Sequence, residues 1–395
     1  MKRILITGGT GFIGGRIVER LYLDGIAEAT CLVHRFSRAS GIARFPVKLV
    51  AGEVWDRQAL KEAMTGCDAV IHCAMSFSGL RRADRHAIVE GARAVCDVAT
   101  DVGIQRLVHF STFSVYGYRH TGMLTEQSSH RPGGEAYGRL KDEAERMVLA
   151  RARAGLPAVI LQPMIVYGPN AHWTAGTVGK LLTGPVVLPV EGRGKCPAVF
   201  VDDVVDAVFL ALSAPAAIGE TFLINGPDSL TWEEFFQGHA REIPGAGVVA
   251  KSTAEVMSVA QAAQNEKTTL KLFTKELREN GEFRRILKSL PLIRSGEALV
   301  RNLISPEKWK SIQSKQFRPK TAPRSVQPSG PAEIFPSLAE IPVLSMEANV
   351  SIAKAREKLG FVPRTSWETG MKKTLEWLRW ARMVPKSDQV SDSVP

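Results

Sequence analysis

The sequence has little that would build a disulfide framework, a structural metal site or a membrane span. It contains five scattered cysteines and no Cys-x-x-Cys pair, an odd set that is typical of free thiols in a reducing compartment. No apolar run reaches the roughly 20 residues of a membrane span. The apolar run at the start is too short for a signal peptide. We therefore expect a cytoplasmic protein without a metal site.

The composition is that of a globular protein, with an uneven distribution of charge. Of the 395 residues, 45% are hydrophobic and 23% are charged, and the formal net charge is +11. Between Lys251 and Arg324 there are sixteen basic and seven acidic residues. That segment lacks interleaved aromatic residues and any recognisable nucleic-acid-binding module, so we expect no nucleic-acid partner.

Short β-branched apolar runs alternate with helical patterns over the first two-thirds of the chain. This alternation predicts an α/β fold in which helices cover both faces of a parallel sheet, a Rossmann-type doubly wound sheet. The expected strands are 3–8, 28–34, 47–53, 69–74, 106–111, 157–163 and 220–227.

The domain organisation follows from where this pattern changes. Residues 1–170, completed by about 198–227, are expected to form the dinucleotide-binding domain. Residues 171–197 and 228–382 form a smaller C-terminal substrate lobe, which includes a mostly helical basic insert at about 251–345. Residues 383–395 are expected to be a disordered tail.

In the stretch "LITGGTGFIGG" an apolar strand runs into Gly8, Gly9, Gly11 and Gly14, and a helix follows. A tight turn needs their backbone freedom, and a diphosphate can approach the amides of a helix N-terminus only where no Cβ atom intervenes. The pattern begins at the first strand, which is the context of a dinucleotide site.

The end of the second expected strand indicates which dinucleotide is bound. It reads "CLVHRFSR", with His34, Arg35 and Arg38 and no carboxylate for ribose hydroxyls. A guanidinium suits a 2′-phosphate, so NADP(H) is favoured and NAD(H) is the alternative. In that alternative, Arg35 stacks on adenine or faces solvent.

Seven motifs occur in a consistent order: "TGGTGFIG", "GEVWD", "VIHCA", "FSTFSVYG", "YGRLK", "LQPMIVYGP" and "FVDDVVDA". Together they resemble the extended short-chain dehydrogenase/reductase family, the NAD(P)-dependent epimerase/dehydratase group, over about residues 1–250 and 348–382. The resemblance implies a Rossmann domain, a smaller substrate lobe and a Ser/Thr–Tyr–Lys catalytic group.

The family's functional residues map onto this sequence one by one. Tyr137 and Lys141 match its Tyr-x-x-x-Lys pair, and Thr112 matches its catalytic Ser/Thr, with Ser111 and Ser114 beside it. The expected cofactor-binding residues are Gly8, Thr10, Gly11, Phe12, Ile13, Gly14, Arg35, Glu53, Val54, Ala74, Tyr137, Lys141 and Pro163.

The chemistry of these groups suits proton transfer to or from a substrate oxygen. A tyrosine with a pKa of about 10 is a poor base near neutral pH. A lysine one helical turn away shares its helix face and favours the phenolate. We therefore expect Tyr137 as general acid/base, Lys141 lowering its pKa, and Thr112 orienting the substrate oxygen.

Two departures from the family bear on the small-molecule substrate. Members that act on nucleotide sugars commonly have an Asn where this chain has Ile165, and an Arg where it has Cys196. This favours oxidoreduction at a secondary alcohol or ketone of an apolar or carrier-bound substrate. The alternatives are a nucleotide-sugar epimerase/dehydratase with transient oxidation, and a non-catalytic nucleotide sensor.

The basic insert has three interpretations. It is a helical decoration that packs on the lobe or on a second subunit, as in a homodimer; a lid over an apolar substrate; or a basic surface for peripheral membrane contact with anionic lipid.

Other polar and aromatic residues have ordinary structural explanations. His72 and His109 lie within apolar strands and are expected to be buried and hydrogen-bonded. Asp202 and Asp203 are expected to cap a helix N-terminus. Trp377 and Trp380 are expected to pack the last helix onto the core.

Overall fold

The computed structural model describes residues 1–75, 81–133, 136–279 and 332–384. The chain divides into two compact units, Met1–Val256 with Glu333–Pro395, and Met257–Ala332. Each unit is described by itself. All elements of the candidate site lie in the first unit.

The centre of the first unit is a seven-stranded sheet in the order β12-β7-β5-β4-β1-β2-β3, with every neighbouring pair parallel. In this order β1 lies inside the sheet, and successive strands are added first on one side of it (β2, β3) and then on the other (β4, β5, β7, β12). This change of side confirms the expected Rossmann-type sheet. The strands are β1 (Arg3–Thr7), β2 (Glu28–Val33), β3 (Val47–Ala51), β4 (Ala69–His72), β5 (Arg106–Phe110), β7 (Ala158–Pro163) and β12 (Thr221–Ile224).

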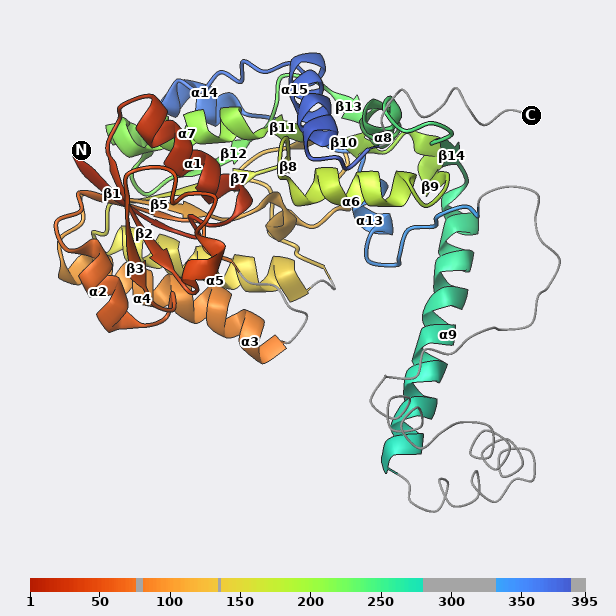
Figure 1. The fold of residues 1–395 in the computed structure, drawn as a ribbon, viewed down its shortest axis with the longest axis horizontal. Helices are drawn as coiled ribbons and strands as arrows, with labels where there is room; N and C mark the ends of the chain where they lie inside the picture. Colours follow the sequence, from red (N-terminus) through yellow and green to blue (C-terminus); the bar gives the residue numbers. More distant parts are fainter. Residues whose placement is uncertain (76–80, 134–135, 280–331, 385–395) are drawn as a thin grey trace, which may run out of the picture. The chain divides into compact units, whose positions relative to one another are not determined.

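Helices cover both faces of this sheet (Figure 1). On one face α1 (Phe12–Leu23) packs against α7 (Val201–Ser213), and α14 (Ala353–Leu359) contacts α7 and β12. On the other face lie α2 (Arg57–Met64), α4 (Gly91–Asp101) and α5 (Ala136–Arg153), which pack side by side in that order. Apolar residues of the two faces form two separate hydrophobic clusters, as a doubly wound sheet requires.

Short elements complete the first unit. Four two-stranded pairs, β8–β11, β10–β13, β9–β14 and β6–β15, lie outside the main sheet. Their strands are β6 (Met123–Leu124), β8 (Ile165–Tyr167), β9 (Val186–Leu188), β10 (Lys195–Cys196), β11 (Ala198–Phe200), β13 (Leu230–Thr231), β14 (Val248–Ala250) and β15 (Asn349–Val350). The remaining helices are α3 (Arg81–Arg85), a π-helical turn (His86–Glu90), α6 (His172–Leu181), α8 (Trp232–Ala240), α13 (Ile341–Leu344) and α15 (Trp367–Trp380).

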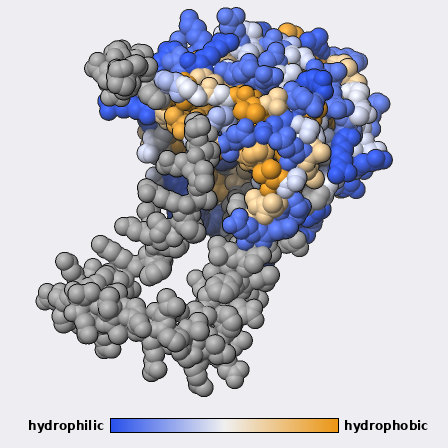
Figure 2. All heavy atoms as spheres, turned by 90° about the vertical axis from the view of Figure 1, so that its right-hand side faces the viewer, coloured by the Kyte–Doolittle hydropathy of each residue, from blue (hydrophilic) through white to orange (hydrophobic). Residues whose placement is uncertain are grey.

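Most of the predicted insert lies outside the described residues, as does all but the first part of the predicted tail. Helix α9 (Thr253–Glu279) begins the insert, in agreement with its predicted helical character. Among the described residues, no helix is both long enough and apolar enough to span a membrane. On the face drawn in Figure 2, apolar side chains form small patches that hydrophilic ones separate.

Three expectations for side chains on helices are wrong. Helix α7 begins at Val201, so Asp202 and Asp203 lie within its first turn rather than at its cap. Asp202 pairs with Arg16, and Asp203 accepts backbone N–H groups from a distant loop. Trp377 packs against the core as expected, whereas Trp380 is 81% exposed and does not.

Candidate active site

The glycine loop joins the end of β1 to the start of α1. Gly8 has φ +78°, and its carbonyl accepts the Gly11 N–H at 2.9 Å. A Cβ atom on Gly14 would lie 2.2 Å from the Gly8 carbonyl oxygen, so the turn closes only with glycine there. No side chain caps the N-terminus of α1. The loop therefore has the exposed amides and the close backbone approach that a dinucleotide diphosphate needs.

Two cavities meet at this loop. One, of about 330 Å³, is lined by Gly8 and Thr10, by the expected adenine-end residues Arg35, Glu53 and Val54, and by Ala74, which was expected near the nicotinamide ribose. The other, of about 560 Å³, is lined by Gly8, Thr10, Gly11, Phe12, Ile13 and Gly14, and by Thr112, Tyr137, Lys141 and Pro163. Every site residue named from the sequence therefore lines one of two adjoining cavities.

Sequence reasoning missed several lining residues. His34 and Trp55 contribute to the smaller cavity, and Met75, Tyr118 and Trp173 to the larger one. His34 directly precedes the predicted residue Arg35, and Trp55 directly follows the predicted residue Val54. Their positions in the sequence could therefore have identified both. Tyr118 follows "FSTFSVYG" immediately, but nothing in its spacing shows that it turns back into the site.

The three candidate catalytic side chains come from two elements. Thr112 follows β5 and caps a short 3-10 turn at Phe113–Tyr116. Tyr137 and Lys141 lie one turn apart near the start of α5, and Thr112 lines the same cavity, where its hydroxyl opposes the rise in the pKa of the Tyr137 phenol. The Lys141 ammonium, 6% exposed, donates to the Phe110 carbonyl at 2.5 Å. Strand β5 and helix α5 thus bring a hydroxyl, a phenol and a cation to one end of the larger cavity.

The electrostatics of this group differ from the sequence expectation. Burial raises the pKa of Tyr137 to about 12, and the Thr112 hydrogen bond opposes that rise. Burial lowers the pKa of Lys141 to about 8, while the nearby Glu145 carboxylate raises it. The low-dielectric surroundings disfavour both charges, and the ammonium is engaged by the Phe110 carbonyl. The phenol is therefore held protonated near neutral pH.

A buried carboxylate that sequence reasoning missed ties these elements together. Glu145, 1% exposed, lies one turn beyond Lys141 on α5. It accepts a hydrogen bond from the Ser111 hydroxyl, and both its oxygens accept from the Gln162 amide at 2.9 Å. Tyr116 donates to the same amide's oxygen at 2.8 Å. Ser111 immediately precedes Thr112, and Gln162 immediately precedes a nicotinamide-pocket candidate, so one carboxylate connects three site-bearing segments.

Two buried histidines lie beneath this end of the cavity. His72 and His109 occupy paired positions on β4 and β5, with ring centroids 5.1 Å apart. His72 bonds the Thr7 hydroxyl at 2.7 Å, as expected. Neither ring nitrogen of His109 has a hydrogen-bond partner among the described residues, so the expected hydrogen bond of His109 is wrong. Burial lowers the pKa of both rings, so both are neutral at physiological pH.

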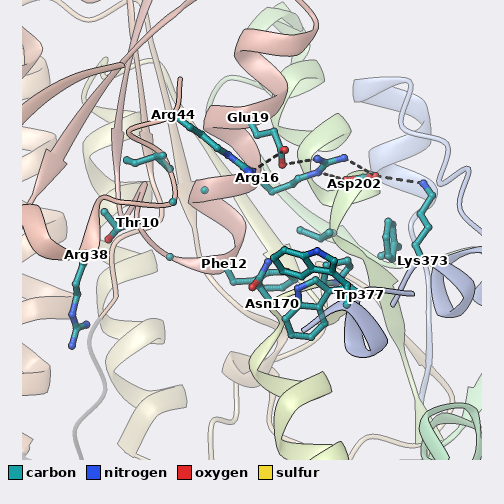
Figure 3. A pocket seen from close by; sticks show the side chains of 18 residues that line it. Thr10, Phe12, Arg16, Glu19, Arg38, Arg44, Asn170, Asp202, Lys373 and Trp377 are labelled. Carbon is teal, nitrogen blue, oxygen red and sulfur yellow. Dashed lines mark hydrogen bonds and ion pairs between the residues drawn. The ribbon is translucent and has the colours of Figure 1, made fainter. Parts of the chain in front are cut away.

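A third cavity, of about 800 Å³, lies on the outer side of the glycine loop. Figure 3 shows Arg16 between Glu19 and Asp202, with Lys373 on the far side of Asp202. Arg44 also pairs with Glu19. Because these cations are matched by carboxylates, the cavity does not present a free cationic site from these side chains.

The parallel sheet, the glycine turn and the two adjoining cavities define a nicotinamide-dinucleotide-binding protein of the Rossmann class. The model of the NAD dependent epimerase/dehydratase family matches residues 4–225. The chain belongs to this family, whose curated relatives include epimerases and reductases.

The curated relatives differ in what they are named for. "Sterol demethylase protein B" of Methylococcus capsulatus is 29% identical over 256 residues, 60% of this chain and 75% of that protein. A putative dihydroflavonol 4-reductase of Synechocystis is 32% identical over 171 residues, 42% of this chain and 49% of that protein. The chain thus spans about half the length of the second relative.

Solved structures show the same fold. A UDP-glucose 4-epimerase from Thermotoga maritima, determined with UDP-glucose, has a TM-score of 0.65 and 20% identity. The match covers 96% of this chain and 99% of the epimerase. At this identity the likeness concerns the fold alone.

Proposed function

We propose that the protein is an NADP(H)-dependent reductase of an apolar ketone, or the corresponding secondary-alcohol dehydrogenase. The observation that supports this best is the lining of the larger cavity. Apart from the candidate catalytic group, the described residues that line this cavity are mainly apolar and aromatic, and they include Met75, Phe113, Met164, Val166 and Trp173. No aspartate or glutamate is among the described residues that line it.

The absence of a carboxylate from this described lining bears on the reaction type. Eliminating water from a sugar needs an acid and a base placed at the leaving hydroxyl and the departing proton. The titratable side chains of the described lining are Tyr137, Lys141, Cys73 and His172, together with Tyr118 and Arg38. This set supports simple proton transfer at one oxygen better than dehydration.

The protonation state of Tyr137 suits the reductive direction. A bound reduced nicotinamide supplies the hydride to the carbonyl carbon. The protonated phenol then donates its proton to the substrate oxygen as negative charge develops there. Thr112 donates a hydrogen bond to the same oxygen, and the Lys141 ammonium stabilises the phenolate that remains.

Two positions argue against a nucleotide-sugar substrate. Ile165 is 1% exposed and Cys196 is fully buried, so neither offers a polar group to a sugar or a phosphate. The neighbouring Arg193 is exposed and pairs with Glu191. Lys195 lines a separate cavity of about 230 Å³ that includes none of the candidate catalytic residues. The relatives named for sterols and dihydroflavonol also fit an apolar substrate.

A substrate screen tests this function. Purified protein is incubated with NADPH and a mixture of sterol, flavonoid and long-chain ketones, and in parallel with UDP-sugars. We expect steady loss of the reduced-nicotinamide absorbance with ketones, and alcohol products by mass spectrometry. UDP-sugar isomers formed without net change in the cofactor would instead establish the epimerase alternative.

The cofactor preference gives a separate prediction. Arg35 is exposed at the smaller cavity, where its Nε donates to His34 Nε2 at 3.1 Å, and His34 pairs with Glu53. Because a guanidinium here can pair with a 2′-phosphate, NADPH should bind at least roughly tenfold more tightly than NADH. Arg35→Ala should remove most of that difference. Fluorescence titration measures both affinities, and equal affinities in the unaltered protein would rule out the preference.

A further inference from the structure

The cavity of about 230 Å³ that Lys195 lines lies at the carboxyl end of β12, apart from the candidate active site. Asn225 and Gly226 line it directly after β12, and Lys195 lines it from β10. Asn349 of β15 and Arg356 of α14 line it as well. None of its described lining residues also lines either of the two cavities at the glycine loop. It is therefore a separate cavity with its own set of polar groups.

Two cationic side chains from different elements line this cavity without a partner. Lys195 on β10 is partly buried, and Arg356 on α14 is exposed. In the part of the chain that the structure describes, neither side chain forms an ion pair or a hydrogen bond. Lys354, on the same helix as Arg356, pairs with Glu220 instead. The charges of Lys195 and Arg356 are thus available to a ligand in the cavity.

The Asn225 side chain has an unsatisfied acceptor. Asn225 is 9% exposed, and its buried Oδ1 has no hydrogen-bond partner among the described residues. Buried polar atoms in folded proteins are normally hydrogen-bonded, so this oxygen calls for a donor that the described side chains do not supply. Asn225 lines the cavity and is otherwise buried, so a donor would reach it from the cavity.

A second acceptor lines the same cavity. One oxygen of the Asp228 carboxylate accepts the Trp367 N–H at 2.6 Å, and a carboxylate can accept further hydrogen bonds. The described lining therefore combines two cations with two oxygen acceptors. A bare anion would satisfy the cations but would be repelled by Asp228 and would leave Asn225 without a donor. A molecule that carries both an anionic group and hydroxyl groups satisfies all four side chains.

We propose that this cavity binds a small hydroxylated phosphate ester, such as glycerol phosphate or a sugar phosphate. A phosphate ester carries about −1.5 to −2 charge at pH 7, which Lys195 and Arg356 together match. The guanidinium can bind two phosphate oxygens at once. Hydroxyl groups of the same molecule then donate to Asn225 and Asp228.

The size of the cavity limits the ligand to a small molecule. Its volume of about 230 Å³ is below the roughly 300–1,000 Å³ of pockets for drug-sized ligands. A molecule of a few carbon atoms with one phosphate fits this volume better than a nucleotide sugar does. The proposal concerns a second ligand and does not depend on the reductase function.

Isothermal titration calorimetry of the full chain in the presence of NADPH tests the ligand class. Glycerol 3-phosphate or glucose 6-phosphate should bind with a stoichiometry of one. Inorganic phosphate and glycerol should each bind at least roughly tenfold more weakly, because each makes only part of the contacts. Equal affinities for inorganic phosphate and the esters, or no binding of either ester at millimolar concentration, would overturn the proposal.

Two substitutions test whether the ester binds in this cavity. Arg356→Gln removes an exposed cation, and Asn225→Leu removes the buried acceptor while nearly keeping the side-chain shape. Each should weaken ester binding at least roughly tenfold, and Asn225→Leu should leave the weak binding of inorganic phosphate unchanged. Arg193→Gln is the matched control, because Arg193 is an exposed cation near Lys195 that does not line the cavity. Its affinity should stay within a factor of about two.

The exposed substitution keeps this test decisive. Arg356→Gln changes no printed contact of the fold, and circular dichroism checks that each variant is folded. Unaltered ester affinity in folded Arg356→Gln would show that the ester binds elsewhere and would overturn the site. Ketone reduction is not measured, so failure of the proposed function leaves this result unaffected.

Discussion

Tyr137→Phe is expected to abolish turnover while leaving dinucleotide binding intact. The change removes only the phenol oxygen, which Thr112 contacts, and keeps the ring that packs beside α4 and Leu140. Loss of a positioned general acid typically costs about 10²–10⁴ in rate. Steady-state rates of NADPH oxidation and fluorescence titration of NADPH measure the two quantities on the same preparation.

Arg139→Gln is a suitable control for that variant. Arg139 lies on the same helix, is exposed, and donates to the Gly133 carbonyl away from the cavity. Its turnover should stay within a factor of about two, as expected for a surface substitution. Near-normal turnover in Tyr137→Phe would show that another group supplies the proton.

The parts of the site that were predictable are local in sequence. The glycine loop is a continuous stretch whose turn, diphosphate approach and helix start all depend on neighbouring residues. Tyr137 and Lys141 are one helical turn apart, so their shared face follows from helix geometry alone. Thr112 follows a buried strand, and the parallel sheet puts the carboxyl end of that strand at the site.

What the sequence did not predict depends on contacts between distant segments. The Glu145 carboxylate meets Gln162 only because α5 packs on β7. Asp203 bonds the amides of Arg364 and Thr365, which a helix-cap rule does not anticipate. The raised pKa of Tyr137 likewise depends on how deeply α5 packs, and helical spacing contains no information about that depth.

The neutral phenol of Tyr137 and the apolar lining of the larger cavity both support the proposed reduction of an apolar ketone. A site that holds Tyr137 protonated can donate a proton to the substrate. His72 and His109, the two buried histidines beneath it, are uncharged. The Lys141 ammonium lines the same cavity, and burial lowers its pKa, so its proton is held more weakly than in water. Activity should therefore depend on the groups that keep Lys141 protonated, and the Glu145 carboxylate is one of them, because its charge raises the pKa of Lys141.

Glu145→Ala is expected to have the largest effect on stability. It leaves the Ser111 hydroxyl and the Gln162 amide without their acceptor and the buried Lys141 without its nearby carboxylate. Leaving a buried hydrogen-bond donor without an acceptor costs about 1–3 kcal/mol, and two donors lose their acceptor here, so the free energy of unfolding should fall by at least about that amount. Urea denaturation measures it, with Glu143→Gln, an exposed position on the same helix, as the control.

Glu145→Gln separates the charge from the hydrogen bonds. The amide can still accept from Gln162, so the loss of stability should be smaller than for alanine. Because the Glu145 charge raises the pKa of Lys141, which burial lowers to about 8, its removal should lower that pKa further. The ammonium is then lost at lower pH, and the alkaline limb of kcat should move to lower pH. An unshifted limb, with folding intact, would show that Glu145 acts only as a hydrogen-bond acceptor.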